Sequence, residues 1–398
     1  MTSIAIVGAG PSGCYTAQAL AKALPEARID LIDRLPVPYG LIRYGVAPDH
    51  QGTKAVIRQF ERLFTRNDVA FFGNVTLGAD LTLEDLRASH EAVVLATGLH
   101  ADRRLGIAGE DLAGVIGSGV VTRGWNDYPD AERPQIGPRV VIVGNGNVAV
   151  DLLRILAKAP AEFDGSDLAP ESGAALQAAG VTRIDVVGRS GAELAKFDPV
   201  MLRELGRLAQ ASLHVHGVTG EGKVIEALQA IDGHRPERAT RVVHFHFGWT
   251  PEGIEGGACV EAVKFRASNG EGTLHLPCDT VLTAIGFDGE TAQADGDGRI
   301  AEGLYATGWY RRGPRGTIPE NRADAQAVAA RIAADLAQAT SDKPGRAALT
   351  AGLPEAVGYD GWRRIDAAEC AACPPDRTRR KIATRAEMLT LARQSEDR

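Results

Sequence analysis

The feature that most constrains this chain is a glycine-rich segment that occurs twice, each time directly after a short apolar run. The first copy, GAGPSG at residues 8–13, follows residues 3–7 and precedes an Ala- and Leu-rich stretch of helical pattern. The second copy, GNGNVA at residues 144–149, follows residues 139–143 in the same way. Strand, glycine turn, helix and a second strand make a βαβ unit of about thirty residues. The sequence therefore predicts at least two α/β domains with parallel sheets.

The first copy has the chemistry of a dinucleotide site. Gly8 allows a tight turn, Gly10 lets a pyrophosphate approach the backbone, and Gly13 lets the helix pack closely on the strand. The free N–H groups at the start of the helix attract the phosphates. Asp33 ends the second strand of the unit, where its carboxylate can accept hydrogen bonds from both ribose hydroxyls.

The second copy differs at two positions. Its third glycine is Ala149, and its second strand ends in Gly188 and Arg189 rather than in an acid. Without a carboxylate there, nothing repels a 2′-phosphate, and Arg189 can pair with one. We therefore expect NADP rather than NAD in the second site. The alternative, an ordinary solvated arginine at the end of a strand, stays open for Arg189.

Two nucleotide sites in one chain of 398 residues suggest a relay of electrons between two cofactors. FAD is the natural partner of NAD(P)H, because a flavin accepts a hydride and releases single electrons. The net charge of −7 gives the chain as a whole no electrostatic reason to bind nucleic acid. No apolar run approaches the roughly 18 residues of a membrane span, so we expect no membrane insertion.

The cysteines and the first residues of the sequence indicate the cellular compartment in which we expect the protein. Five cysteines do not form a disulfide framework, and the C-x-x-C of Cys370 and Cys373 is interpreted as part of a surface connection. A redox dithiol or half a metal site is the alternative. The chain opens directly into a strand pattern, without a signal or transit segment, so we expect a cytoplasmic protein.

Beyond the glycines, several longer segments have a recognisable pattern. They are residues 39–50 (YGLIRYGVAPDH), 144–151 with 154–156, 186–189 with 202–205, and 308–321. With these segments the sequence resembles the adrenodoxin reductase-like ferredoxin–NADP⁺ reductases, within the two-dinucleotide-binding-domain flavoproteins. The resemblance covers nearly the whole chain.

The resemblance implies two Rossmann-like domains, with an NADPH-binding domain at residues 105–291 inserted into an FAD-binding domain made of residues 1–104 and 292–398. It also implies hydride transfer from NADPH to the flavin, followed by one-electron transfer to an iron–sulfur ferredoxin. Two alternatives remain open. One is an NAD(P)H-dependent flavoprotein reductase or monooxygenase that acts on a small-molecule acceptor, and the other is a nucleotide-sensing flavoprotein without catalysis.

The resemblance further implies that His50, Asp151 and Glu204 form a polar group near the nicotinamide. A structural histidine, a helix-start aspartate and a surface glutamate are the simpler interpretations of these three. From the fingerprints and the resemblance together we expect cofactor contacts from Gly8, Gly10, Pro11, Ser12, Gly13, Asp33, Arg34, Gly40, Leu41, Gly98, Gly144, Asn145, Gly146, Asn147, Val148, Arg189, Glu204, Gly308, Trp309, Gly316, Thr317 and Ile318. We expect no metal site.

Arg311, Arg312 and Arg315 form a basic cluster next to the predicted redox centre of an acidic chain. Such a cluster can receive an acidic ferredoxin, and Arg203 and Arg207 are expected to extend the surface. A solvated arginine face without a partner is the alternative for each.

The sequence also departs from the family pattern. Ser190 stands where a second arginine is usual, so one contact to the 2′-phosphate is lost and the preference for NADP is expected to be weaker. Glu193 and Lys196 can also alter the choice of nucleotide. Arg315 and the pair Pro319–Glu320 change the loop expected near the flavin. Finally, residues 159–180 suit a surface insertion, and the last sixty residues carry little chemistry that can be interpreted.

Overall fold

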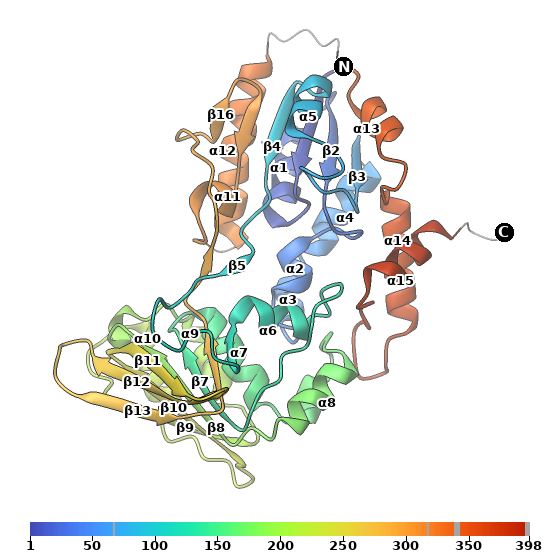
Figure 1. The fold of residues 1–398 in the computed structure, drawn as a ribbon. Helices are drawn as coiled ribbons and strands as arrows, with labels where there is room; N and C mark the ends of the chain where they lie inside the picture. Colours follow the sequence, from blue (N-terminus) through green and yellow to red (C-terminus); the bar gives the residue numbers. More distant parts are fainter. Residues whose placement is uncertain (67, 317, 338–342, 395–398) are drawn as a thin grey trace.

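A computed structural model describes residues 1–66, 68–316, 318–337 and 343–394. The chain forms two lobes stacked along the long axis of the molecule, each built on a six-stranded sheet (Figure 1). The sheet of the first lobe has the order β16 (Arg299–Ala301), β17 (Leu304–Ala306), β4 (Ala92–Leu95), β1 (Ser3–Val7), β2 (Arg28–Ile32) and β3 (Val69–Phe72). All of its pairings are parallel except that of β16 with β17. This lobe therefore takes strands from both ends of the chain.

The second lobe is formed by the middle of the chain, and its six-stranded sheet is parallel throughout. Its order is β6 (Val115–Gly117), β14 (Thr280–Thr283), β7 (Arg139–Val143), β8 (Arg183–Gly188), β10 (Arg241–Phe247) and β9 (Ala211–Val215). A three-stranded antiparallel sheet belongs to the same lobe: β11 (Trp249–Gly256), β12 (Val260–Ala267) and β13 (Thr273–Pro277).

The helices of the first lobe are α1 (Pro11–Ala23), α2 (Gly40–Tyr44), α3 (Gln51–Lys54), α4 (Ile57–Arg66), α5 (Leu83–Ser89), α11 (Trp309–Arg312), α12 (Ile318–Leu336), α13 (Arg346–Gly352), α14 (Tyr359–Ala371) and α15 (Arg385–Arg393). Those of the second lobe are α6 (Ser118–Trp125), α7 (Asn147–Ala157), α8 (Pro170–Ala178), α9 (Pro199–Leu205) and α10 (Lys223–Ile231), with 3₁₀ turns at Pro160–Phe163 and Ala192–Leu194.

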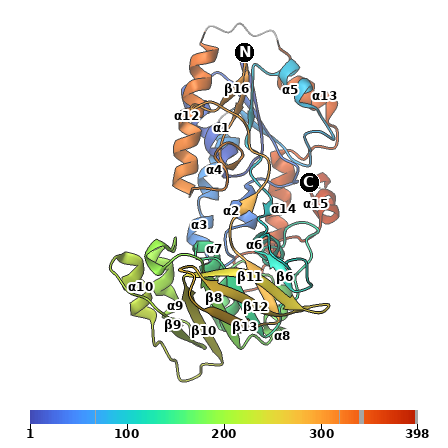
Figure 2. The same cartoon turned by 60° about the vertical axis from the view of Figure 1, so that its left-hand side comes forward.

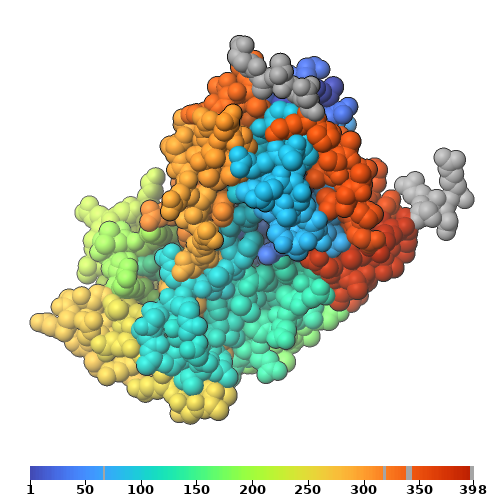
Figure 3. All heavy atoms as spheres, turned by 45° about the horizontal axis from the view of Figure 1, so that its top comes forward, coloured from blue at the N-terminus to red at the C-terminus, as the bar shows by residue number. Residues whose placement is uncertain are grey.

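The first sheet is buried on both faces, which explains why its strands are continuous apolar runs. On one face Ile4 and Ile6 pack with residues of α1, α4, α12 and α14. On the other face Ala5 and Val7 pack with residues of α5 and α13. Figure 2 shows α12 beside α1, and Figure 3 shows the orange and red C-terminal part of the chain against its blue and cyan N-terminal part, although these segments are far apart in sequence.

The second sheet is covered differently on its two faces. One face packs against α6, α7, α9 and α10, with Val140, Ile142 and Val186 among the buried residues. The opposite face packs Val141 and Val187 against the antiparallel sheet β11–β13. The carboxyl ends of β7 and β8 are left free for the turns that carry the second fingerprint.

The chain crosses between the lobes twice, and the two crossing segments are paired. β5 (Ala101–Asp102) and β15 (Phe287–Asp288) run antiparallel, with Phe287 opposite Asp102. Residues 289–298 connect this pair to β16. No helix among the described residues is long and apolar enough to span a bilayer.

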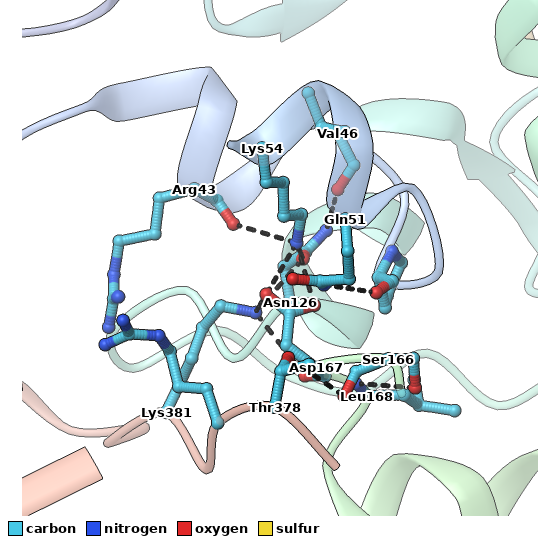
Figure 4. Close-up of polar contacts among 12 residues, drawn as sticks. Arg43, Val46, Gln51, Lys54, Asn126, Ser166, Asp167, Leu168, Thr378 and Lys381 are labelled. Carbon is cyan, nitrogen blue, oxygen red and sulfur yellow. Dashed lines mark hydrogen bonds and ion pairs between the residues drawn. The ribbon is translucent and has the colours of Figure 1, made fainter. Parts of the chain in front are cut away.

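A buried polar cluster connects both lobes and the C-terminal segment (Figure 4). The Nζ atom of Lys54 lies 2.8 Å from each carboxylate oxygen of Asp167 and 2.7 Å from Oδ1 of Asn126. The Nζ atom of Lys381 lies 2.7 Å from Oδ2 of the same aspartate. The side chains of Lys54, Asp167 and Lys381 are 6%, 5% and 1% exposed. Four polar groups from distant parts of the chain are therefore held together away from water.

The charges in this cluster are strongly coupled. Burial, followed by the like charge of Lys381, lowers the pKa of Lys54 well below its ordinary value. Burial also opposes ionisation of Asp167, but the two ammonium groups outweigh it and lower the pKa of this carboxyl to about 2. Asp167 therefore stays ionised at neutral pH and compensates the lysine charge.

The cluster corrects two expectations. Residues 159–180 are not simply a surface insertion, because Phe163, Asp167 and Leu168 are buried. The last sixty residues do carry chemistry, since they supply Lys381 and the fully buried Glu369, which pairs with Arg43. Both expectations failed because a polar, Ala- and Gly-rich composition does not reveal which polar side chains find a buried partner of opposite charge.

Candidate functional site

The first glycine turn has the geometry that its sequence predicts. Gly8 has φ +109°, and a Cβ atom there would lie 2.4 Å from the carbonyl oxygen of Ala96. A Cβ on Gly13 would lie 1.8 Å from the oxygen of Gly8, so only glycine lets α1 pack this closely on β1. α1 begins at Pro11 without a side-chain cap, which leaves its N-terminal N–H groups open to a ligand.

Two further segments converge on this turn. The carboxylate of Asp33, at the end of β2, accepts hydrogen bonds from the backbone N–H groups of Ala9 (2.8 Å) and Leu35 (2.9 Å). Burial raises the pKa of Asp33, and these two hydrogen bonds oppose the rise. Gly40, beside Leu41, has φ +46°, and a Cβ there would lie 2.9 Å from Cα of Gly10. The loop that contains Gly40 therefore lies directly on the glycine turn.

Two other predicted cofactor contacts of the first lobe lie near its surface. Arg34 is exposed, and its guanidinium donates to the hydroxyl of Tyr128 at 3.1 Å. Gly98, two residues beyond the buried Ala96, has φ +68° and open space where a Cβ would be.

The segment after β17 returns to the start of α1. Gly308 has φ +67°, and a Cβ there would lie 2.0 Å from Oγ of Ser12. The next residue, Trp309, packs on Phe287 at 5.4 Å between ring centroids. Its indole Nε1 is buried and has no hydrogen-bond partner among the described residues. Gly316 has φ +97°, Ile318 is the first residue of α12, and Thr317 lies outside the described residues.

The second glycine turn resembles the first in outline. Gly144 has φ +143°, and a Cβ there would lie 2.3 Å from the oxygen of Ala284, so glycine is required. A Cβ on Gly146 would meet nothing within 4 Å, and α7 starts at Asn147 without a side-chain cap. This open helix N-terminus suits a phosphate. Val148 is partly buried against the core that contains Ala149.

The segment after β8 folds over the second turn. The side chain of Asn145 donates to Oγ of Ser190 at 2.8 Å, and its backbone oxygen accepts from the N–H of Lys196. A Cβ on Gly191 would lie 2.4 Å from both carboxylate oxygens of Glu193. Arg189 is exposed. The region expected to receive a 2′-phosphate thus combines one free arginine, one hydroxyl and one acid.

His50, Asp151 and Glu204 come together at the boundary between the lobes. The Nδ1 atom of His50 lies 3.5 Å from Oδ1 of Asp151, and its Nε2 atom lies 3.7 Å from Oε2 of Glu204. Burial raises the pKa of Asp151, and the charges of Arg154 and His50 oppose the rise. The three side chains remain 22%, 19% and 41% exposed, so the group can be reached by a ligand.

The elements that carry this group are themselves tied together. His50 precedes α3 in the first lobe, whereas Asp151 is on α7 and Glu204 is on α9 of the second lobe. α9 is capped by the side chain of Asp198, whose own N–H donates to Oδ1 of Asn147 at 2.6 Å. The first residue of α7 therefore fixes the start of α9.

The five arginines expected to meet a partner fall into two kinds. Arg203, Arg207 and Arg315 are exposed. The guanidinium groups of Arg311 and Arg312 instead pair with Asp324, and the two side chains are only 16% and 24% exposed. One carboxylate offsets only part of their combined charge, but the pairing holds both side chains within the lobe, which does not fit a free docking surface.

Comparisons with known proteins agree with this geometry. The family model for the pyridine nucleotide-disulphide oxidoreductases matches residues 2–303. The chain belongs to this family. It is 44% identical over 420 residues to cindoxin reductase of Citrobacter braakii, covering 98% of this chain and 91% of the relative. It is 33% identical over 448 residues to the NADPH-ferredoxin reductase FprA of Mycobacterium tuberculosis, covering 98% of both chains.

The solved structure of Mycobacterium tuberculosis FprA in complex with NADPH superimposes with a TM-score of 0.91 at 31% identity, covering 98% of this chain and 100% of that one. Within the family the chain is thus an adrenodoxin reductase-like ferredoxin–NADP⁺ reductase homologue. The predicted two-dinucleotide-binding fold is confirmed.

Membership of this flavoprotein group implies FAD and NADP(H) as cofactors, and the residues present fit both. In the first lobe the fit rests on the uncapped start of α1, the space beside Gly10 and the buried indole N–H of Trp309, which has no acceptor in the part of the chain that the structure describes. In the second lobe it rests on the uncapped start of α7 and the open space at Gly146.

Several residues of the site were not predicted from the sequence. Asp324 accepts from the N–H of Gly308 (2.6 Å) and from Oγ1 of Thr307 (2.9 Å), and so shapes the segment beside α1. Phe287 supports Trp309. The only sequence signal for Asp324 is an acid in an otherwise Ala-rich helix, which a surface position explains equally well.

Proposed function

We propose that this chain is an FAD-dependent ferredoxin–NADP⁺ reductase, which accepts a hydride from NADPH and passes electrons singly to an iron–sulfur ferredoxin. The observation that carries the proposal is the group of His50, Asp151 and Glu204, in which a side chain of the first lobe meets two acids of the second. Such a group lies where two cofactors, one held by each lobe, must meet. The names of the relatives, reductases of ferredoxin and cindoxin, support the same reaction class.

Each lobe has a separate task in this proposal. The start of α1 and Asp33 would hold the pyrophosphate and ribose of FAD, and Gly308, Trp309 and Gly316 would hold its ring. The start of α7 holds the pyrophosphate of NADPH, and Arg189 pairs with its 2′-phosphate. Bound flavin supplies the ability to accept a hydride and to release single electrons.

His50, Asp151 and Glu204 orient the nicotinamide and control charge next to it. The histidine can hold a proton on Nδ1 toward Asp151 or on Nε2 toward Glu204. Trp309, packed on Phe287, excludes water from one side of the ring position. These roles need no general base that attacks a substrate, because the cofactors carry the chemistry.

The ferredoxin is proposed to dock on the exposed arginines Arg203, Arg207 and Arg315. An acidic iron–sulfur protein is attracted by such charges even though the chain is acidic overall. Arg311 and Arg312 then have a supporting part, in which they hold the segment through Asp324. A cytoplasmic location stays a prediction.

Anaerobic stopped-flow spectroscopy of the purified flavoprotein tests the function. NADPH is expected to bleach the flavin, and an iron–sulfur ferredoxin is expected to reoxidise it faster than oxygen or a quinone does at equal concentration. Faster reoxidation by oxygen or a quinone would favour a monooxygenase or a reductase of small molecules. Absence of any turnover with NADPH and ferricyanide would favour a nucleotide sensor.

A further inference from the structure

Arg154, on α7, contacts both lobes through one guanidinium group. Its Nε donates to Oδ2 of Asp49 at 2.7 Å, and its Nη2 donates to Oδ1 of Asp49 at 2.9 Å. The same Nη2 donates to Oδ1 of Asp151 at 2.6 Å. The side chains of Arg154 and Asp49 are 4% and 6% exposed. A buried arginine thus holds one carboxylate of the first lobe and one of its own helix in a fixed arrangement.

Both carboxylates are close to His50, one in space and the other in sequence. Oδ1 of Asp151, which accepts from Arg154, is also the atom that lies 3.5 Å from Nδ1 of His50. Asp49 is the residue directly before His50, so fixing its side chain also fixes the backbone that carries the imidazole. Arg154 therefore acts on His50 by two routes, although it does not touch the histidine itself.

The electrostatics agree with this geometry. Burial favours the neutral form of Asp49, but Arg154 and Lys158 outweigh it and hold the pKa of this carboxyl well below its usual range. Burial raises the pKa of Asp151, and the charge of Arg154 is the first influence that opposes this. Without the guanidinium, Asp151 would lose this opposing charge, and its charged form would be less favoured.

The loop that carries His50 has a second, independent anchor. The carbonyl oxygen of His50 accepts from the N–H groups of Thr53 and Lys54, and Lys54 is fixed in its turn by Asp167 (Figure 4). Loss of Arg154 should therefore disturb the position and charge of the His50 group without releasing the whole loop.

We propose that Arg154 is a positioning residue for hydride transfer, which holds the carboxylate of Asp151 and the backbone at Asp49 so that His50 faces the nicotinamide. This inference rests on the proposed function, in which His50 and Asp151 lie beside that ring. The groups that face His50 are Asp151 from α7 and Glu204 from α9, with Arg154 and Asp49 behind the former.

Lys158 provides a matched control on the same helix. Its Nζ lies 2.7 Å from Oδ2 of Asp49, so it shares the contact between the lobes, but no contact with Asp151 is found among the described residues. If Arg154 only connected the lobes, its substitution should affect the enzyme in the same way as substitution of Lys158. If Arg154 also positions Asp151, the two substitutions should have different effects.

The test measures flavin reduction by NADPH in single-turnover stopped-flow experiments on the holoenzyme, from pH 5.5 to about pH 9. Arg154→Gln is expected to slow reduction at saturating NADPH by 10-fold or more and to change the shape of the pH profile, with apparent NADPH affinity within about 3-fold of wild type. Lys158→Met is expected to stay within about 2-fold in rate and to keep the wild-type profile. Arg154→Lys keeps the charge but loses the bidentate geometry, and should fall between them.

The double variant Arg154→Gln/Asp151→Asn decides whether the effect passes through Asp151. If it does, Asp151→Asn should slow the Arg154→Gln enzyme by less than about 2-fold, although it slows the wild type much more. Additive effects, or equal behaviour of Arg154→Gln and Lys158→Met, would overturn the proposal while leaving the proposed function intact. A wild-type flavin that NADPH does not reduce would overturn both. If Arg154→Gln loses its flavin, the rate and pH profile of Arg154→Lys against Lys158→Met decide the question alone.

Discussion

The carboxylate of Asp324 accepts a hydrogen bond of 2.6 Å from the backbone N–H of Gly308, and this bond holds the C-terminal segment against the start of α1. The same carboxylate binds Oγ1 of Thr307 and pairs with Arg311 and Arg312. One acid on α12 thus organises the backbone turn expected beside the flavin and two partly buried cations.

Asp324→Ala is therefore expected to lose FAD. The substitution leaves the N–H of Gly308 and two partly buried guanidinium groups without their acceptor, which costs about 2–4 kcal/mol of stability. The ratio of flavin to protein absorbance and the thermal midpoint measure the effect. Asp297→Asn, at a side chain that is 65% exposed, is the control and should leave both unchanged. If Asp324→Ala retained the wild-type content of bound FAD, the role given to this residue would be contradicted.

A side chain added at each of two glycines of the second turn should have different effects, one on NADPH binding and the other on stability. Gly146 has φ −118° and open space around its Cβ position, so Gly146→Val should fold and keep FAD but weaken NADPH binding by more than about 10-fold. Gly144→Val should destabilise the lobe itself, because Gly144 has φ +143° and a Cβ atom there would lie 2.3 Å from the carbonyl oxygen of Ala284. Titration with NADPH and thermal unfolding separate the two outcomes. Normal NADPH binding by Gly146→Val would place the pyrophosphate elsewhere.

Nucleotide choice should depend on residues 189 and 190. Arg189→Ala removes the predicted partner of the 2′-phosphate, and one charge-assisted contact is worth about 1.5–3 kcal/mol. We expect kcat/KM for NADPH to fall roughly 10- to 100-fold, with little change for NADH. Ser190→Arg should raise the preference for NADPH. Steady-state kinetics with both nucleotides test this, and an equal loss for NADPH and NADH would contradict it.

The buried cluster of Lys54, Asn126, Asp167 and Lys381 should determine how the free energy of unfolding changes in acid. Asp167→Asn leaves Lys54 and Lys381 without a counter-charge and is expected to cost about 3–5 kcal/mol. The folded pKa of Asp167, about 2, lies below the ordinary 3.8, so its contribution is present above about pH 4 and is lost as the pH falls toward 2. The difference between wild type and variant in urea unfolding should shrink in that window. Glu171→Gln, at an exposed pair with Arg380, should cost less than about 1 kcal/mol at neutral pH.

Charge reversal at the proposed docking surface should affect only the protein acceptor. Arg315→Glu and Arg203→Glu are expected to lower kcat/KM for ferredoxin by about 3- to 10-fold at low salt, since surface charges act mainly on association rates. Ferricyanide reduction should be unchanged. Arg238→Glu, at another exposed arginine, serves as the control for net charge. If Arg315→Glu and Arg238→Glu lowered kcat/KM for ferredoxin equally, Arg315 would not belong to the docking surface.

Much of the fold was predictable because it depends on local patterns. The apolar runs and the glycine turns occur twice with the spacing of a βαβ unit, and Asp33 stands where the first unit ends its second strand. The meeting of His50 with Asp151 and Glu204 followed only from the family resemblance. No local pattern connects these positions.

The contacts between the lobes were not predictable. Arg154 and Asp49 are 105 positions apart, and Lys54 and Asp167 are 113 apart. A lone lysine or aspartate in a sequence usually lies at the surface, and only tertiary packing shows which ones are buried with a partner. Arg311 and Arg312 show the reverse, since two arginines that suggest an open basic surface are instead held against Asp324 within the lobe.

The sequence by itself determined that the chain forms two dinucleotide-binding units, and that the second strand of one is followed by an acid and that of the other by an arginine. Those properties follow from steric and hydrogen-bonding demands within thirty or so neighbouring residues. Only the tertiary structure decided which charges hold the lobes together and bring His50 to Asp151. The energy of a buried charge depends on the partner that packing places beside it, and not on its neighbours in sequence.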